Sequence, residues 1–123
     1  MKLKASQVGP LRLKLLAAQG GVCKLCHRPL KPADAVLDHC HLHGHIRGVL
    51  HRWCNSTLGR IENWAHRSGL GREFFSAKCA TYLQAHAIPV YQELHPTFKT
   101  PEEKVEAQRA KAKKRRAAKK ESV

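Results

Sequence analysis

The sequence predicts a small α+β domain in which a two-stranded hairpin lies between helices, followed by a basic helix. Two observations carry this prediction. Short alternating segments flank a turn near the middle of the chain, and apolar residues recur every three or four positions on both sides of it. With 123 residues and an apolar share of 42%, the chain can build one modest core. We expect the folded domain to span residues 1–99 and a basic helical tail to span residues 100–123.

The first half of the chain contains a predicted helix and the hairpin. Gly9-Pro10 suits a helix start, because the first helical residue needs no N–H, and Gly20-Gly21 suits a helix end. These signals predict a helix over residues 10–19. Short strands are predicted at Ala35–His39 and Ile46–Leu50, joined by a turn unusually rich in histidine.

Two helices are predicted after the hairpin, over residues 51–66 and 72–86. The first would bury one apolar face, and we interpret Trp53 as a packing residue or a platform for base stacking. The expected buried residues of the two helices are Leu58, Ile61, Trp64 and Ala65 in the first, and Phe75, Cys79, Tyr82 and Leu83 in the second. Thr100-Pro101 is a good start for the basic tail helix, with threonine as the cap.

The charge of the chain indicates a polyanionic partner. The formal net charge is +14, and the run from Arg109 to Lys120 contains eight basic residues and no acid. Residues 1–108, with 15 basic and 8 acidic side chains, still carry +7. A basic body with a more basic tail favours binding to nucleic acid. The tail is interpreted as a phosphate contact, with a merely solubilising helix as the alternative.

The five cysteines indicate a metal site rather than disulfides. Their number is odd, no secretory signal follows Met1, and no apolar run is long enough to span a membrane. We therefore expect no membrane partner and a reducing, cytoplasmic location, in which paired cysteines are typical metal ligands. Zinc prefers four tetrahedral N or S ligands, and pairs of ligands two residues apart usually supply them. The predicted zinc ligands are Cys23, Cys26, His51 and Cys54, with Cys40 as a rival ligand and Cys79 as a core residue.

A second group of side chains suits phosphodiester hydrolysis. This reaction needs a base that deprotonates water and a cation that neutralises the phosphate. A neutral histidine such as His39 suits the first role at pH 7. Asp38 and Asn55 offer the hard oxygens that Mg²⁺ prefers. On a regular strand His39 and Asp38 face opposite sides, and His41 shares the side of His39. Arg47 is a candidate DNA contact or hairpin support.

Three short motifs place these residues in order: Asp38-His39-x-His41, Ile46-Arg47-Gly48-Val49-Leu50 and Cys54-Asn55-x-x-Leu58-Gly59. They resemble the phage recombination endonuclease VII family of HNH, or His-Me finger, nucleases. A weaker match at Phe75 and Tyr82-Leu83 extends the resemblance over about residues 11–86. The resemblance implies a ββα-metal motif, a structural zinc, and cleavage of branched DNA such as Holliday junctions by a homodimer that uses Mg²⁺ or Mn²⁺.

The resemblance also implies roles for single residues. Asp38 and Asn55 match the ligands of the catalytic metal, His39 matches the general base, and His41 matches a second active-site histidine that contacts the phosphate. Three cysteines match zinc ligands, whereas the family usually has cysteine where this chain has His51, which zinc also accepts. Two alternatives stay open: a nicking or site-specific HNH endonuclease, and a non-catalytic zinc-finger DNA-binding protein, which would have no use for Asp38, His39 and Asn55 together.

Overall fold

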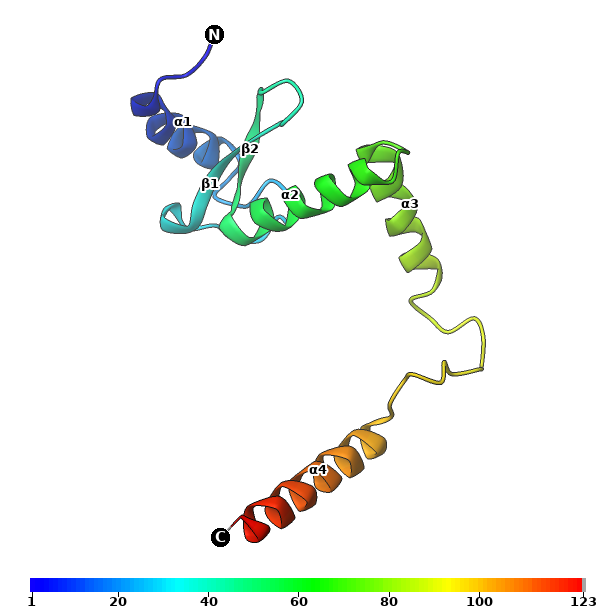
Figure 1. The fold of residues 1–123 in the computed structure, drawn as a ribbon. Coiled ribbons are helices and arrows are strands. Elements are labelled where there is room, and N and C mark those ends of the chain that lie inside the picture. Colours follow the sequence, from blue (N-terminus) through cyan, green and yellow to red (C-terminus); the bar gives the residue numbers. More distant parts are fainter. Residues whose placement is uncertain (123) are drawn as a thin grey trace. The chain divides into compact units, whose positions relative to one another are not determined.

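The computed structural model describes residues 1–122, which form two compact units, the first from Met1 to Ala85 and the second beginning at His86. The first unit contains all of the sheet and most of the helices, and the second contains one long helix (Figure 1). The predicted α+β class is confirmed. Among the described residues, the elements are α1 (Ala5–Ala18), β1 (Ala35–His39), β2 (Ile46–His51), α2 (Arg52–Arg67), α3 (Arg72–Ala85), α4 (Pro101–Glu121) and a 3-10 turn at Pro32–Asp34.

Helix α1 begins five residues earlier than predicted, so the prediction of Pro10 at its first position was wrong. The backbone N–H of Lys4 donates to the Gln7 side-chain oxygen at 2.9 Å, and this cap starts the helix at Ala5. Pro10 lies inside the helix, where it removes one backbone hydrogen bond without ending it. The predicted end is confirmed, because Gly20 and Gly21 follow with positive φ values of 73° and 72°.

The hairpin has the predicted strands and one irregularity. β1 and β2 are antiparallel, and β2 extends one residue beyond the prediction to His51, which also precedes the first turn of α2. Asp38 is opposite Gly48, but the next residue, His39, is opposite Ile46. Arg47 is therefore an extra residue in β2, a β-bulge that redirects its side chain.

A side-chain amide covers part of the free edge of β2. The Gln19 side chain, just after α1, donates from Nε2 to the Val49 carbonyl at 2.9 Å and to the Val22 carbonyl at 3.0 Å. Its Oε1 accepts from the Val49 N–H at 2.8 Å. The amide of Gln19 thus pairs with Val49 much as a neighbouring strand would, and it fixes α1 to the sheet.

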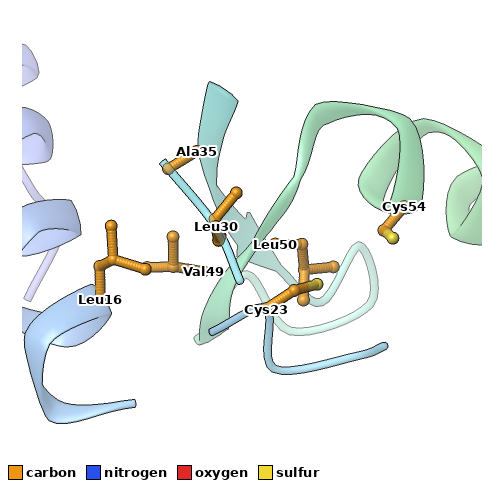
Figure 2. Packing of buried hydrophobic residues seen from close by; sticks show 7 residues of the cluster. All are labelled: Leu16, Cys23, Leu30, Ala35, Val49, Leu50 and Cys54. Atoms are coloured by element: carbon orange, nitrogen blue, oxygen red, sulfur yellow. The ribbon is translucent and has the colours of Figure 1, made fainter. Parts of the chain in front are cut away.

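The core is small and includes two of the candidate metal ligands. Its buried members come from α1, from the turn over residues 22–30 (the knuckle turn), from the hairpin and from the start of α2: Leu16, Cys23, Leu30, Ala35, Val49, Leu50 and Cys54. Figure 2 shows Leu16 of α1 pointing toward Val49 of β2. Because thiols make up part of so small a core, a metal ion bound by them would also stabilise the packing of this unit.

The structure corrects the predicted apolar faces of the two helices after the hairpin. On α2, Leu58 and Ala65 pack inward, but Trp53, Ile61 and Trp64 are exposed at 70%, 42% and 63%. They lie on one side of the helix because positions 53, 57, 61 and 64 share a face. On α3 the predicted face is also uncovered, since Cys79, Tyr82 and Leu83 are exposed. Helical periodicity located the apolar side chains of α2, but it did not show which of them are buried.

The tail helix has the predicted start. The Thr100 hydroxyl accepts the Glu103 backbone N–H at 3.2 Å, and Pro101 is the first helical residue. Every residue of α4 is at least partly exposed. No helix of the described residues is both long and apolar enough to cross a membrane.

Candidate metal centre and active site

Four side chains from the knuckle turn and the strand–helix junction converge on one point. The ligand atoms of Cys23, Cys26, His51 and Cys54 all lie within 4.8 Å of one another. Cys23 and Cys26 come from the turn that follows α1, His51 ends β2, and Cys54 lies in the first turn of α2. The side chain of Lys24 lies against the backbone of Gly48, where an added Cβ would come within 3.1 Å of it. Glycine at this position lets the turn approach β2 closely.

The distances within this group fit a tetrahedral zinc ion. His51 Nδ1 lies 3.4 Å from Cys26 Sγ and 3.8 Å from Cys54 Sγ. Usual Zn–S and Zn–N bond lengths with tetrahedral angles place such atoms about 3.6 Å apart. His51 Nε2 lies 3.0 Å from the Pro29 carbonyl oxygen, which can only accept, so this nitrogen carries the proton and Nδ1 is free to bind a metal. The four residues could therefore form a structural zinc site.

The surroundings of the group favour the thiolate form of Cys26 but not that of Cys54. A hydrogen bond from Arg28 lowers the pKa of Cys26 to about 6. Burial raises the pKa of the Cys54 thiol to about 11. Because zinc binds thiolates, loading the site must remove the Cys54 proton at neutral pH. Cys40, the rival ligand, is buried in the hairpin turn and does not belong to this group. Cys79 is exposed on α3, so its prediction as a core residue was wrong.

Asp38 is a buried carboxylate fully engaged by an arginine. It is 5% exposed, and its two oxygens accept hydrogen bonds from Arg47 Nε at 2.8 Å and Arg47 Nη2 at 3.1 Å. The bulge places Arg47 on the same side of the hairpin as Asp38. Of the two roles left open for Arg47, support of the hairpin is therefore observed in the structure.

The arginine also reaches helix α2. Arg47 Nη2 and Nη1 donate to both oxygens of Glu62, at 2.9 and 3.2 Å, and Arg72 Nη1 donates to Glu62 Oε2 at 2.7 Å. The Arg47 guanidinium lowers the pKa of Glu62, so this carboxylate is anionic at neutral pH. The four side chains Asp38, Arg47, Glu62 and Arg72 form a chain of ion pairs that joins β1, β2, α2 and α3.

The histidines of the predicted site lie on the exposed side of the hairpin end. His39 is the last residue of β1 and is exposed, whereas the preceding Asp38 is buried, as the alternation of a strand requires. The rings of His39 and His41 lie 4.7 Å apart between centroids and are tilted by 36°. His41 also lines a cavity of about 310 Å³ with Glu62, His66 and Arg72. The structure thus brings His39 together with His41, and His41 together with Glu62.

Asn55 lies in α2, half-buried, one residue after the candidate zinc ligand Cys54. Positions 55, 58 and 62 fall on one side of the helix, and Leu58 shares a hollow with Asp38 and Arg47. Asn55 therefore lies on the side of α2 that faces the hairpin. Among residues 1–122, no hydrogen bond joins it to Asp38.

Sequence reasoning missed Glu62 and Arg72. The signal for Glu62 was its spacing of seven residues from Asn55, which places both on one side of a helix. Its ion pairs depend on the bulge at Arg47, for which the sequence offers no clear sign.

The site has the donors that a hard divalent cation needs. Asp38 supplies a carboxylate that already binds a cation, the Arg47 guanidinium. Asn55 supplies an amide oxygen from helix α2. The chemistry of these donors fits Mg²⁺ or Mn²⁺.

The fold and the metal group together define a class of protein. It is a small α+β domain in which a hairpin is followed at once by a helix, with a Cys/His group that could bind zinc where the two meet. The family model of recombination endonuclease VII matches residues 3–94. The chain belongs to this family and is by membership a DNA endonuclease. The match extends beyond residues 11–86, where the sequence resemblance is apparent.

Proposed function

We propose that the protein is a divalent-metal-dependent endonuclease that cleaves branched DNA such as Holliday junctions. The observation that carries the proposal is that Asp38 and His39 are adjacent at the end of β1. There a buried carboxylate is followed directly by an exposed histidine, beside a helix whose start is tied to the Cys/His group. The family membership supports a DNA substrate.

The residues have distinct roles in this proposal. His39 takes a proton from the attacking water, and its exposure leaves the ring accessible to water and DNA. Asp38 and Asn55 hold the catalytic Mg²⁺ or Mn²⁺, which supplies positive charge for the scissile phosphate and the leaving 3′ oxygen. His41, whose ring is near that of His39, contacts the phosphate. The zinc held by Cys23, Cys26, His51 and Cys54 fixes the start of α2, and thereby Asn55, against the hairpin.

The proposal also includes a partner, a second copy of the chain, and a cellular compartment. We propose that a second copy of the chain covers the exposed apolar side chains of α2 and α3, among them Ile61, Trp64 and Leu83. The thiolate ligands suit a reducing compartment, the cytoplasm, which is that of the host cell if the chain is of phage origin. Light scattering of the parent and of Trp64→Ser should give a dimer and a weakened dimer, and a monomeric parent would exclude this interface.

The test of the function compares four DNA forms, namely junction, nicked, linear duplex and single-stranded DNA, each with Mg²⁺, with Mn²⁺ and with chelator. The parent should cut junction DNA fastest and only with the metal. His39→Ala should slow cleavage by about 10²–10⁴-fold, because it removes the base. Asp38→Ala should be at least as slow. Both variants should keep zinc and bind junction DNA, since neither residue belongs to the zinc group.

The outcomes separate the alternatives. Variants that cut as fast as the parent would refute the assigned active site. Preference for nicked or linear DNA of one sequence would indicate a nicking or site-specific HNH enzyme. A parent that binds DNA but cuts none of the four forms with either metal would identify a zinc-finger binding protein.

A further inference from the structure

The Arg47 guanidinium occupies the position that the proposed function gives to a divalent cation. It covers both oxygens of Asp38 and, on its other side, both oxygens of Glu62. A bidentate arginine occupies the lone pairs on one side of a carboxylate, the side from which an ion would also bind both oxygens. An ion that binds both oxygens of Asp38 from this side therefore requires Arg47 to move.

We propose, building on the proposed function, that the catalytic ion displaces Arg47 from Asp38 and that Glu62 becomes a second carboxylate of the ion site. Arg47 then competes with the ion: it neutralises Asp38 and Glu62 as long as no ion is bound. The exchange adds Glu62, on α2, to the ligands Asp38 and Asn55.

The burial of the three side chains supports this exchange. Asp38 and Glu62 are only 6% and 13% exposed, whereas Arg47 is 34% exposed and comes from a bulge. The carboxylates are thus held by their elements, and the arginine has access to solvent. A nearly buried Asp38 needs a cation at all times, because an unpaired buried charge is strongly unfavourable. Arg47 meets this need in the ion-free protein, and the divalent ion meets it afterwards.

The charges also favour the exchange when DNA is present. Asp38 and Glu62 are balanced by Arg47 and Arg72, so the ion-pair chain is neutral without a metal. Replacing Arg47 by a divalent ion leaves a net charge of +1 there and frees a guanidinium, the side chain that best matches a phosphate in two hydrogen bonds. Both changes attract the DNA backbone to the site.

The experiment measures Mn²⁺ binding to the zinc-loaded full chain without DNA, by electron paramagnetic resonance of the free ion. Arg47→Gln removes the competing cation and should tighten Mn²⁺ binding about tenfold or more. Glu62→Gln removes a ligand and should weaken it about tenfold. Arg72→Gln is the matched control, because it removes the same charge beside Glu62 but leaves Asp38 paired with Arg47. Its effect should stay below about threefold. If Arg47→Gln binds Mn²⁺ no more tightly than Arg72→Gln, the exchange is refuted.

A second measurement uses the parent protein and is independent of how well the variants fold. The Nε–H resonance of Arg47, identified by its loss in Arg47→Lys, should shift on titration with Mg²⁺ as its bond to Asp38 breaks. A resonance that stays in place at saturating Mg²⁺ would refute the exchange. If the parent cuts DNA while these results are negative, the proposed function stands and the inference falls. If the parent binds no divalent ion and cuts no DNA, both fall.

Discussion

The Gln19 side chain offers a sharp test of how the hairpin is held to α1. The change Gln19→Ala deletes three hydrogen bonds, to the Val49 N–H, the Val49 carbonyl and the Val22 carbonyl. At about 1 kcal/mol for each bond, the expected loss of unfolding free energy is about 3 kcal/mol. Val49 is fully buried, so its N–H loses its partner in a place that water reaches poorly. For a domain of this size, the melting temperature should fall by about 10–20 °C.

The assay is urea unfolding of zinc-loaded protein, followed by far-ultraviolet circular dichroism. The control is Gln84→Ala, at an exposed position of α3, which should change stability by less than about 0.5 kcal/mol. Gln19→Glu tests the direction of these hydrogen bonds. One carboxylate oxygen can still accept from the Val49 N–H, but the other faces two carbonyl oxygens and has no proton to donate to them. The stability of Gln19→Glu should recover as the pH falls toward 4, where the protonated acid donates again. A loss in Gln19→Ala no larger than in Gln84→Ala would refute this account of the edge of β2.

Four further predictions concern zinc, the tail and the ion pairs. Purified protein should contain about one zinc per chain, and Cys54→Ser should lose both the zinc and the folded hairpin; a folded, zinc-free parent would contradict this. Because the Cys54 pKa is about 11 without metal, zinc binding should release a proton, and the apparent affinity should rise at least about tenfold per pH unit near pH 7. Truncation after Gln108 should weaken DNA binding and flatten the plot of log affinity against log salt, whereas an unchanged slope would show that the tail contacts no phosphate. The lowered pKa of Glu62 means that its ion pairs stabilise the fold above its ordinary pKa of 4.5 and are lost as the pH falls through the lower folded value. The stability difference between parent and Glu62→Gln should therefore shrink between pH 5 and pH 3 in urea unfolding.

The parts of the fold that could be predicted depend on short-range signals. Both strands, the cap at Thr100 and the end of α1 just before Gly20-Gly21 follow from local residue preferences, and the structure confirms them. The convergence of the Cys and His pairs could be predicted because two-residue spacing leaves few geometries that bring four ligands together.

The parts that failed depend on contacts between distant segments. Helical periodicity in α2 gave a broad apolar side, but only the part with Leu58 and Ala65 packs inward, and Trp64 is left exposed. The ion pairs of Arg47 depend on one extra residue in β2, which reverses the alternation that sequence reasoning assumes. The roles of Asp38, His39 and Asn55 in cleavage stay predictions.

If α4 binds DNA, as its charge predicts, the segment between α3 and α4 limits where cleavage can occur. Fifteen residues separate the end of α3 at Ala85 from the start of α4 at Pro101. Fully extended, such a segment spans at most about 50 Å, the length of about 15 base pairs. Where α4 holds a duplex, the nuclease unit can search only this short neighbourhood, at a high local concentration. The segment would then act as a tether between the bound tail and the nuclease unit. Lengthening it should widen the spread of cut positions around a bound tail, and shortening it should narrow that spread.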